Sequence, residues 1–289
     1  MTNRMKSFLI LICVISLQII VYIMFLRPVI FSWGATEDET KMSLVGDSLA
    51  PYISSTRAIS INAPISEVWK WIIQLGADRG GFFSYEFIEK SLGYKGRSVD
   101  KTVPESQDMK VGRVVPGSLD ETLIEYSWPV LAVEPGKSFV LKNWGAFVLK
   151  EVNARETRLI VRTHGRETPN LISVIGDFFM MPLHYLMERR MLMEFKVRAE
   201  GRDPLSPTVD IMWFFGLLLS CVGIISMIFI SRGLYRVLVS AFYSVVWLWP
   251  LLVFDPHPIH SIGLLLIVSL TATWFVIDNR LHQAESVAQ

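Results

Sequence analysis

The chain has 289 residues, 51% of which are hydrophobic, and its formal net charge is +1 at pH 7. Soluble domains are usually less apolar than this, and a nucleic-acid-binding protein needs a clustered basic face that this nearly neutral chain lacks. Its two cysteines, Cys13 and Cys221, lie in long apolar runs and form neither a disulfide framework nor a CxxC metal motif. We therefore expect a membrane protein without a nucleic-acid partner.

Residues 1–33 predict an N-terminal transmembrane anchor. The run from Ser7 to Leu26 contains no charged residue, and a helix of about 20 such residues spans the roughly 30 Å hydrocarbon core of a bilayer. A cleavable signal peptide is the alternative, but its apolar core is normally about 7–15 residues long and precedes a small-residue cleavage site. The longer run favours an uncleaved anchor. The polar residues 34–51 that follow predict a linker.

Residues 52–203 carry most of the charge and have the length of one domain. Apolar residues recur at helical spacing after Pro64 and alternate in strand fashion from Ile124 onward. The expected elements are a strand at 57–62, helices at 64–73 and 84–92, strands at 124–130, 139–144, 146–152 and 158–164, and a helix at 171–200 kinked at Pro182. This order predicts an α+β fold. A sheet curved around the long C-terminal helix can enclose an apolar pocket.

Residues 204–280 predict three further transmembrane helices, and residues 281–289 form a short tail. The three apolar runs cover 211–231, 237–254 and 259–277. Backbone polar groups must be satisfied within lipid, so each run is expected to be helical. Together with the N-terminal anchor, these runs predict four transmembrane helices.

Short-loop lysine and arginine residues predict the orientation of the four helices, because such residues favour the cytoplasmic side. Arg4, Arg232 and Arg280 fall on one side of the membrane, whereas the turn at 255–260 has neither Lys nor Arg. We therefore expect both termini in the cytoplasm and the domain at 52–203 outside it.

Six stretches between residues 57 and 200 carry a resemblance to known proteins: INAPISEVWKWIIQLG, RGGFFSYEFIE, VDKTVPESQDMKVG, LAVEPGKSFVL, RLIVRTHGR and MERRMLMEFKVRAE. In this order they resemble the START-like, helix-grip superfamily, also described as SRPBCC or polyketide cyclase/dehydrase-like, and in particular a membrane-anchored bacterial subgroup. The resemblance implies a helix-grip fold and a bacterial source; the transmembrane helices lie outside it and rest on hydropathy, which with that source predicts a bacterial cell membrane. Because the superfamily includes lipid carriers, hormone receptors, cyclases and oxygenase domains, it implies no single function. The chain departs from the subgroup at Ser106, where an aromatic residue is usual.

The segment LGADRGGFFSYEFIEKSLG is the first candidate for the ligand site, because in related folds the helices after the first strand form a lid over the pocket. Large residues on the strand at 124–130 can line the wall of the same pocket, as can an aromatic on the last helix. The alternative is that the aromatics are core residues and the glycines only turn the chain. The candidate ligand-binding residues are Arg79, Gly80, Gly81, Phe82, Phe83, Tyr85, Glu86, Tyr126, Trp128 and Phe179.

Several charged residues predict solvent-exposed surfaces rather than a reactive site. His164 and Arg162 alternate with apolar residues and favour a solvated strand face. The charged run 188–190 favours a solvated helix face, with membrane-surface contact as the alternative. His257 and His260 have the HxxH spacing, but no set of further ligands completes a metal site there. We expect no metal, no cofactor and no assignable catalytic residue.

These observations predict a membrane-tethered domain that binds a hydrophobic or amphipathic small molecule, such as a lipid, in an internal pocket. One alternative is a cyclase-type or hydrolase-type enzyme that uses Tyr85, Glu86 or His164 in the same pocket. The other is a non-catalytic membrane assembly or sensor subunit, for which the domain interior is expected to be filled.

Overall fold

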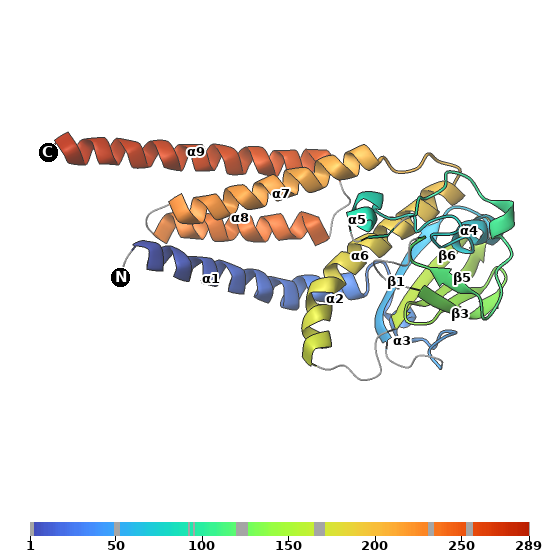
Figure 1. Ribbon diagram of the computed structural model, residues 1–289. Helices are drawn as coiled ribbons and strands as arrows, with labels where there is room; N and C mark the ends of the chain where they lie inside the picture. Colours follow the sequence, from blue (N-terminus) through green and yellow to red (C-terminus); the bar gives the residue numbers. More distant parts are fainter. Residues whose placement is uncertain are drawn as a thin grey trace. The chain divides into compact units, whose positions relative to one another are not determined.

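A computed structural model describes most of the chain: residues 3–48, 53–91, 93–94, 96–119, 127–164, 171–230, 234–252 and 257–288. The chain forms two compact units. The first comprises Met1–Val29 and Ser206–Gln289, and the second comprises Ile30–Leu205. The two ends of the chain thus belong to one unit and the middle of the chain forms the other (Figure 1).

The second unit contains one antiparallel sheet of six strands in the order β1-β6-β5-β4-β3-β2. The first strand therefore pairs with the last, in register from Ser55 opposite Thr163 to Ile61 opposite Thr157. The strands are β1 (Ile53–Ile61), β2 (Val114–Pro116), β3 (Ser127–Glu134), β4 (Ser138–Leu141), β5 (Gly145–Asn153) and β6 (Glu156–His164). The predicted α+β class is confirmed.

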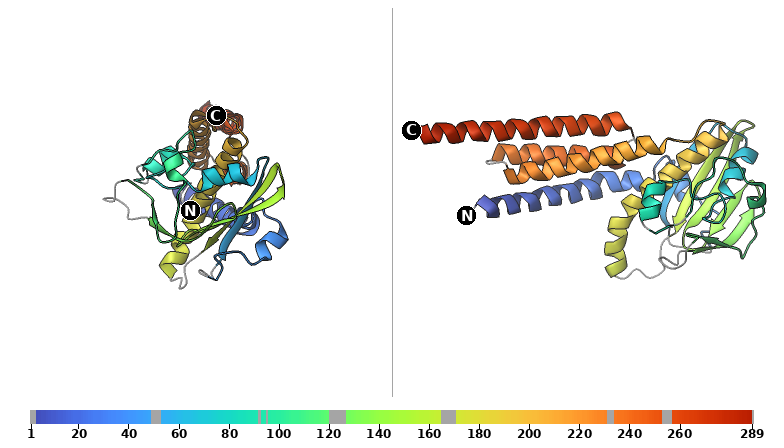
Figure 2. Two further views of the ribbon diagram at one scale, coloured as in Figure 1. Left: turned by 90° about the vertical axis from the view of Figure 1, so that its right-hand side faces the viewer. Right: turned by 45° about the horizontal axis from the view of Figure 1, so that its top comes forward.

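Helices cover one face of this sheet, which we call the inner face (Figure 2). α6 (Leu171–Ala199) is 29 residues long, includes Pro182, and packs Leu192 and Phe195 onto inner-face residues. Residues at every second position of β1 and β6, such as Ile59 and Leu159, enter the same core. Val68 and Ile72 of α4 (Ile65–Ile72) enter the same core. The short helix α5 (Glu86–Ser91) follows Ser84, which donates to the Met187 carbonyl of α6.

The opposite, outer face of the sheet is covered by residues 34–48, which we call the strap. This segment, for which composition predicts a linker, contains α3 (Glu37–Lys41). Thr36 and Glu39 form a reciprocal capping box at the start of α3. Leu44 packs against the outer-face side chains of Ala58, Val140, Ala146, Val148 and Ile160. The strap is therefore a packed layer of the second unit.

The first unit is helical, with exposed apolar side chains. Within the described residues, three helical stretches are long and apolar enough to cross a membrane: Phe8–Phe31, Pro207–Phe229 and Pro258–Leu281. The apolar part of α8 is shorter, Leu238–Leu248, so a fourth span stays a prediction. The helices are α1 (Asn3–Val21), continued by a π-helical turn and α2 (Arg27–Phe31), then α7 (Pro207–Ile230), α8 (Leu234–Leu252) and α9 (Pro258–Ala288). The last two residues of α2, from Ile30 onward, belong to the second unit.

Glycines allow α7 and α9 to approach closely. A Cβ at Gly216 would lie 2.7 Å from the Ser261 side chain, and a Cβ at Gly223 would lie 2.6 Å from the Val268 side chain. Small residues at helix contacts are typical of packing between membrane helices, where apolar burial gives little driving force. This contact is therefore what a pair of lipid-embedded helices requires.

Candidate functional site

The predicted lid is a loop held in place by main-chain hydrogen bonds. Gly76 and Gly81 exchange two such bonds, of 3.2 and 2.9 Å, and the Gly80 carbonyl accepts from the Val99 amide at 3.0 Å. Gly81 has a φ of +84°, and a Cβ there would lie 2.6 Å from the Ser98 Cα. Both the backbone angle and the close approach of a second chain segment require glycine at this position.

The aromatic residues of this loop point into the core. Phe82 lies with its ring centroid 5.5 Å from Trp128 and 6.0 Å from Trp144. Phe83 has a φ of +55°, which is strained for a bulky residue, and lies 5.5 Å from Phe195 of α6. Side chains therefore fill the interior beneath the loop.

The polar residues of the loop bind neighbouring main chain. Arg79 is buried, and its Nη2 donates to the Ser106 carbonyl. Ser106 is itself buried, and its main-chain carbonyl is the acceptor for Arg79. Glu86 accepts from the Ser98 amide at 2.9 Å and pairs with Lys90 at 3.3 Å.

Of the remaining three candidate ligand-binding residues, the structure describes the side chain of Tyr85 alone. Tyr85 is buried, and the Arg190 guanidinium lies 5.6 Å from its ring centroid. Tyr126 lies outside the described residues. Phe179 belongs to α6, but its side chain is outside the described part of the molecule. Of the candidate residues, Phe82, Phe83 and Trp128 thus pack in the same hydrophobic core.

Glu89 on α5 is a buried carboxylate that the sequence does not single out. It is 5% exposed, and its Oε1 has no hydrogen-bond partner in the described chain. Burial, with a smaller contribution from Glu86, raises the pKa of Glu89 to about 7, while Lys90 acts in the opposite direction. Its position on a short helix, one residue before Lys90 and three after Glu86, gives no clear sequence signal of burial.

A second buried polar group lies at one end of the inner face, which we call the polar end. It comprises Ser55 and Arg57 of β1, Thr163 of β6, and His184 and Glu188 of α6. Glu188 accepts from the Arg57 Nη1 at 2.7 Å and from the Thr163 hydroxyl at 3.1 Å. The expectation of a solvated helix face at 188–190 is wrong, because all three residues are buried. Glu188 binds Arg57 of β1, whereas the other two side chains lie over the rings of Trp33 and Tyr85.

Arg57 also binds the end of the N-terminal helical run. Its Nε donates to the Ile30 carbonyl at 2.7 Å, and its guanidinium lies 5.2 Å from the ring centroid of Tyr185. Helix C-terminal carbonyls lack partners within their own helix. Arg57 therefore satisfies the end of α2 and the carboxylate of Glu188 with the same guanidinium.

His184 is the titratable group of the polar end that remains accessible. Its Nε2 lies 3.5 Å from a carboxylate oxygen of Glu188, and its side chain is 35% exposed. Desolvation lowers the pKa of His184, Glu188 opposes this shift, and Arg57 adds to it. The ring is therefore held towards its neutral form beside a buried ion pair.

Three buried polar atoms at or beside the polar end lack hydrogen-bond partners within the described chain: Ser55 Oγ, Arg57 Nη2 and Trp144 Nε1. Trp144 directly precedes Gly145, which pairs with Thr163, which in turn pairs with Ser55. Two of the three atoms can only donate, and the hydroxyl can also donate. Buried polar groups are normally hydrogen-bonded, so this end of the interior is suited to receive an acceptor oxygen.

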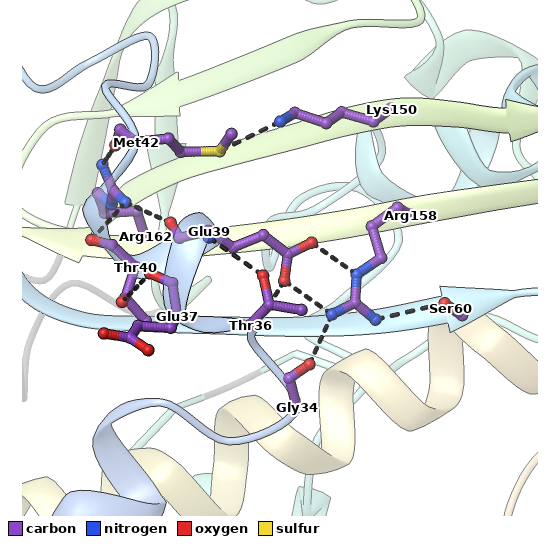
Figure 3. Close-up of polar contacts among 10 residues, drawn as sticks. All are labelled: Gly34, Thr36, Glu37, Glu39, Thr40, Met42, Ser60, Lys150, Arg158 and Arg162. Carbon is purple, nitrogen blue, oxygen red and sulfur yellow. Dashed lines mark hydrogen bonds and ion pairs between the residues drawn. The ribbon is translucent and has the colours of Figure 1, made fainter.

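On the outer face, Arg158 and Arg162 bind the strap (Figure 3). Arg158 forms two hydrogen bonds of 2.8 Å with the Glu39 carboxylate, which lower the pKa of Glu39. Arg162 binds Asp47 at 2.6 Å and main-chain carbonyls of the strap, among them that of Met42 at 2.7 Å.

His164 also faces the strap, with its Nε2 3.2 Å from Asp47. Burial alone raises the pKa of Asp47, but hydrogen bonds from the Leu44 amide, His164 and Arg162 outweigh it and lower that pKa. The expectation of a solvated strand face for Arg162 and His164 is wrong, because the strap covers both side chains.

The residues named for the enzymatic alternative do not meet. His164 lies on the outer face against Asp47, whereas Tyr85 contacts Arg190 and Glu86 contacts Ser98. Across the described residues, no group of three or more His, Cys, Asp or Glu side chains could hold a metal ion.

Comparisons with known proteins leave the family of the chain open. No family model matches it, and no curated protein matches it. A solved structure, that of the protein SSP2350 from Staphylococcus saprophyticus, is similar over 51% of this chain and 93% of its own, with 16% identity and a TM-score of 0.30. That similarity is too low to assign either a fold family or a function.

Proposed function

We propose that the chain is a membrane-tethered START-like, helix-grip domain that binds an amphipathic small molecule, such as a lipid, in the interior of the domain. In this proposal four transmembrane helices anchor it in a bacterial cell membrane, with both termini in the cytoplasm and the domain outside. The role is binding rather than catalysis. The proposal extends the family resemblance of residues 57–200 to the function of the domain.

One observation carries the ligand assignment: within the described residues, the buried atoms Ser55 Oγ, Arg57 Nη2 and Trp144 Nε1 have no hydrogen-bond partner. The two obligate donors favour a ligand that presents a carbonyl, carboxylate or phosphate oxygen. The Trp144 ring is also part of the aromatic core, with its centroid 4.7 Å from Trp128 and 5.6 Å from Phe147. A polar head beside an aromatic wall fits an amphipathic molecule.

The proposal is tested with the purified full chain. We expect native mass spectrometry to detect a bound lipid, and the delipidated protein to bind a fluorescent fatty acid. Trp144→Phe keeps an aromatic ring but removes the donor, and a lost hydrogen bond of about 1 kcal/mol weakens binding roughly fivefold. Trp128→Phe is the matched control, because it alters the same aromatic cluster and leaves the partnerless donor in place.

Two results contradict the proposal. If delipidated protein binds neither lipid nor probe, the domain is not a carrier. If Trp144→Phe and Trp128→Phe weaken binding equally, the partnerless donor does not recognise the ligand.

A second candidate is a non-catalytic assembly or sensor subunit. It is favoured by the aromatic side chains around Phe82 and Phe83, which fill the described interior beneath the loop. This candidate predicts a protein partner recovered by crosslinking in cells, and no lipid retained by the purified chain. Recovery of a stoichiometric lipid without a partner excludes it.

A further inference from the structure

The first part of α6 differs from the rest of that helix. Residues 171–183, LISVIGDFFMMPL, contain one charged residue, Asp177. Ile175 and Met180 are each 52% exposed, whereas Leu192 and Phe195 further along the helix are buried in the core. An apolar helix segment with neighbouring exposed large side chains is typical of a contact surface.

Contacts within the second unit place this segment near the end of the N-terminal candidate span. That span is Phe8–Phe31, and the carbonyl of Ile30 in its last turn accepts from Arg57 at 2.7 Å. Arg57 in turn binds Glu188 of α6 at 2.7 Å. At 1.5 Å per residue, Met180 lies about 12 Å along the helix from Glu188.

Neighbouring residues extend the apolar surface. Ile53, the first residue of β1, is 48% exposed. The next residue, Ser54, contacts the sulfur of Met181 with its hydroxyl at 3.8 Å. The exposed apolar residues therefore come from β1 and α6 together.

We infer that the first part of α6, residues 171–183, lies in the headgroup region of the bilayer, with Ile175 and Met180 in contact with lipid. The bilayer is the occupant that the contacts favour, because a hydrogen-bonded path of two residues joins the end of a membrane-spanning helix to this helix. Interfacial helices insert only about 5–10 Å into the boundary between headgroups and acyl chains. The carboxylate of Asp177 remains at the headgroup level at such a depth. The inference rests on the membrane attachment in the proposed function, and not on ligand binding.

The test uses the full chain in vesicles of phosphatidylethanolamine and phosphatidylglycerol. With the native cysteines replaced by serine, Ile175→Cys and Met180→Cys are each labelled with an environment-sensitive dye. Val152→Cys is the matched control, because Val152 is an apolar residue with 54% exposure on the β5–β6 hairpin. Native Cys13, retained alone, reports on the N-terminal candidate span.

We expect dyes at 175 and 180 to show a blue shift, loss of iodide quenching, and quenching by a lipid nitroxide near the headgroup end of the acyl chain. The dye at 152 should be quenched by iodide alone. If iodide quenches the dyes at 175 and 180 as strongly as the dye at 152, the inference is overturned. It is also overturned if neither iodide nor the lipid nitroxide quenches the dyes at 175 and 180, because that result indicates that a second protein copy covers the surface.

The Cys13 dye separates failure of the inference from failure of membrane attachment. If the lipid nitroxides quench Cys13 but not 175 and 180, the chain spans the membrane and only the placement of α6 is wrong. If they quench none of these sites, the membrane attachment fails and the inference fails with it. Ligand binding is measured separately on the same protein.

Discussion

Replacement of Glu89 by Gln should stabilise the second unit at neutral and alkaline pH but not at pH 4.5. The native pKa of Glu89 is about 7, against an ordinary value of 4.5. Between these two values the folded protein keeps a proton that the unfolded chain has lost, so stability falls as pH rises. At 1.36 kcal/mol per pH unit this costs roughly 3 kcal/mol by pH 7 and then levels off. Glutamine cannot ionise, so Glu89→Gln avoids this cost.

The measurement is thermal unfolding of the full chain in detergent, followed by tryptophan fluorescence from pH 4.5 to pH 8. For a unit of this size, a difference of about 3 kcal/mol corresponds to roughly 6–12 °C in Tm. The Tm difference between Glu89→Gln and wild type should grow up to about pH 7. Glu105→Gln, which removes an exposed loop carboxylate, should leave the pH profile unchanged. Parallel wild-type and Glu89→Gln curves would refute the reasoning.

Two further predictions concern the loop and the strap. Gly81 and Gly112 share a φ near +85°, but only Gly81 has a neighbour within 4 Å of an added Cβ. Gly81→Ala should therefore destabilise by about 1–3 kcal/mol more than Gly112→Ala, and equal Tm values for the two variants would show that the close approach is unimportant. Arg162→Leu leaves buried strap groups unpaired, a loss of about 3–5 kcal/mol for a broken buried pair. The Lys41 side chain is already exposed, so loosening of the strap backbone should make trypsin cleave faster at Lys41. Arg155→Leu, on an exposed hairpin, should leave cleavage at Lys41 slow, and equal cleavage of the two variants would contradict the role of Arg162.

The sequence predicts secondary structure well where the periodicity of apolar residues within one segment is enough to identify the element. The alternation in 158–164 yields β6, and the long apolar stripe after 171 yields α6. The same alternation gives the wrong environment for Arg162, because the strap that covers it lies more than 110 residues earlier in the chain. One local signal was available: Thr36 and Glu39 have the spacing of a capping box, which indicates a helix rather than a linker.

The sequence also predicts the wrong environment for residues 188–190, which are buried rather than solvent-exposed, for a similar reason. Three consecutive charged residues on a helix usually face water, and no nearby residue reveals their partners. Arg57 comes from β1, Trp33 from the chain before the sheet and Tyr85 from the loop before α5. The polar end is a product of tertiary packing and could not be read from the helix sequence alone.

The pairing of β1 with β6 also fixes when this domain can fold during synthesis. Neither β1 nor the strap can make its native contacts until β6 has been synthesised. β1 pairs with β6, and Asp47 of the strap binds Arg162 of β6, 115 residues later in the chain. At roughly 5–20 residues per second, the ribosome needs on the order of ten seconds to make that intervening chain. During this interval the N-terminal apolar helix has already emerged, while the first strand has no partner. The N-terminal segment must therefore engage its apolar surroundings well before the sheet that later binds its end exists.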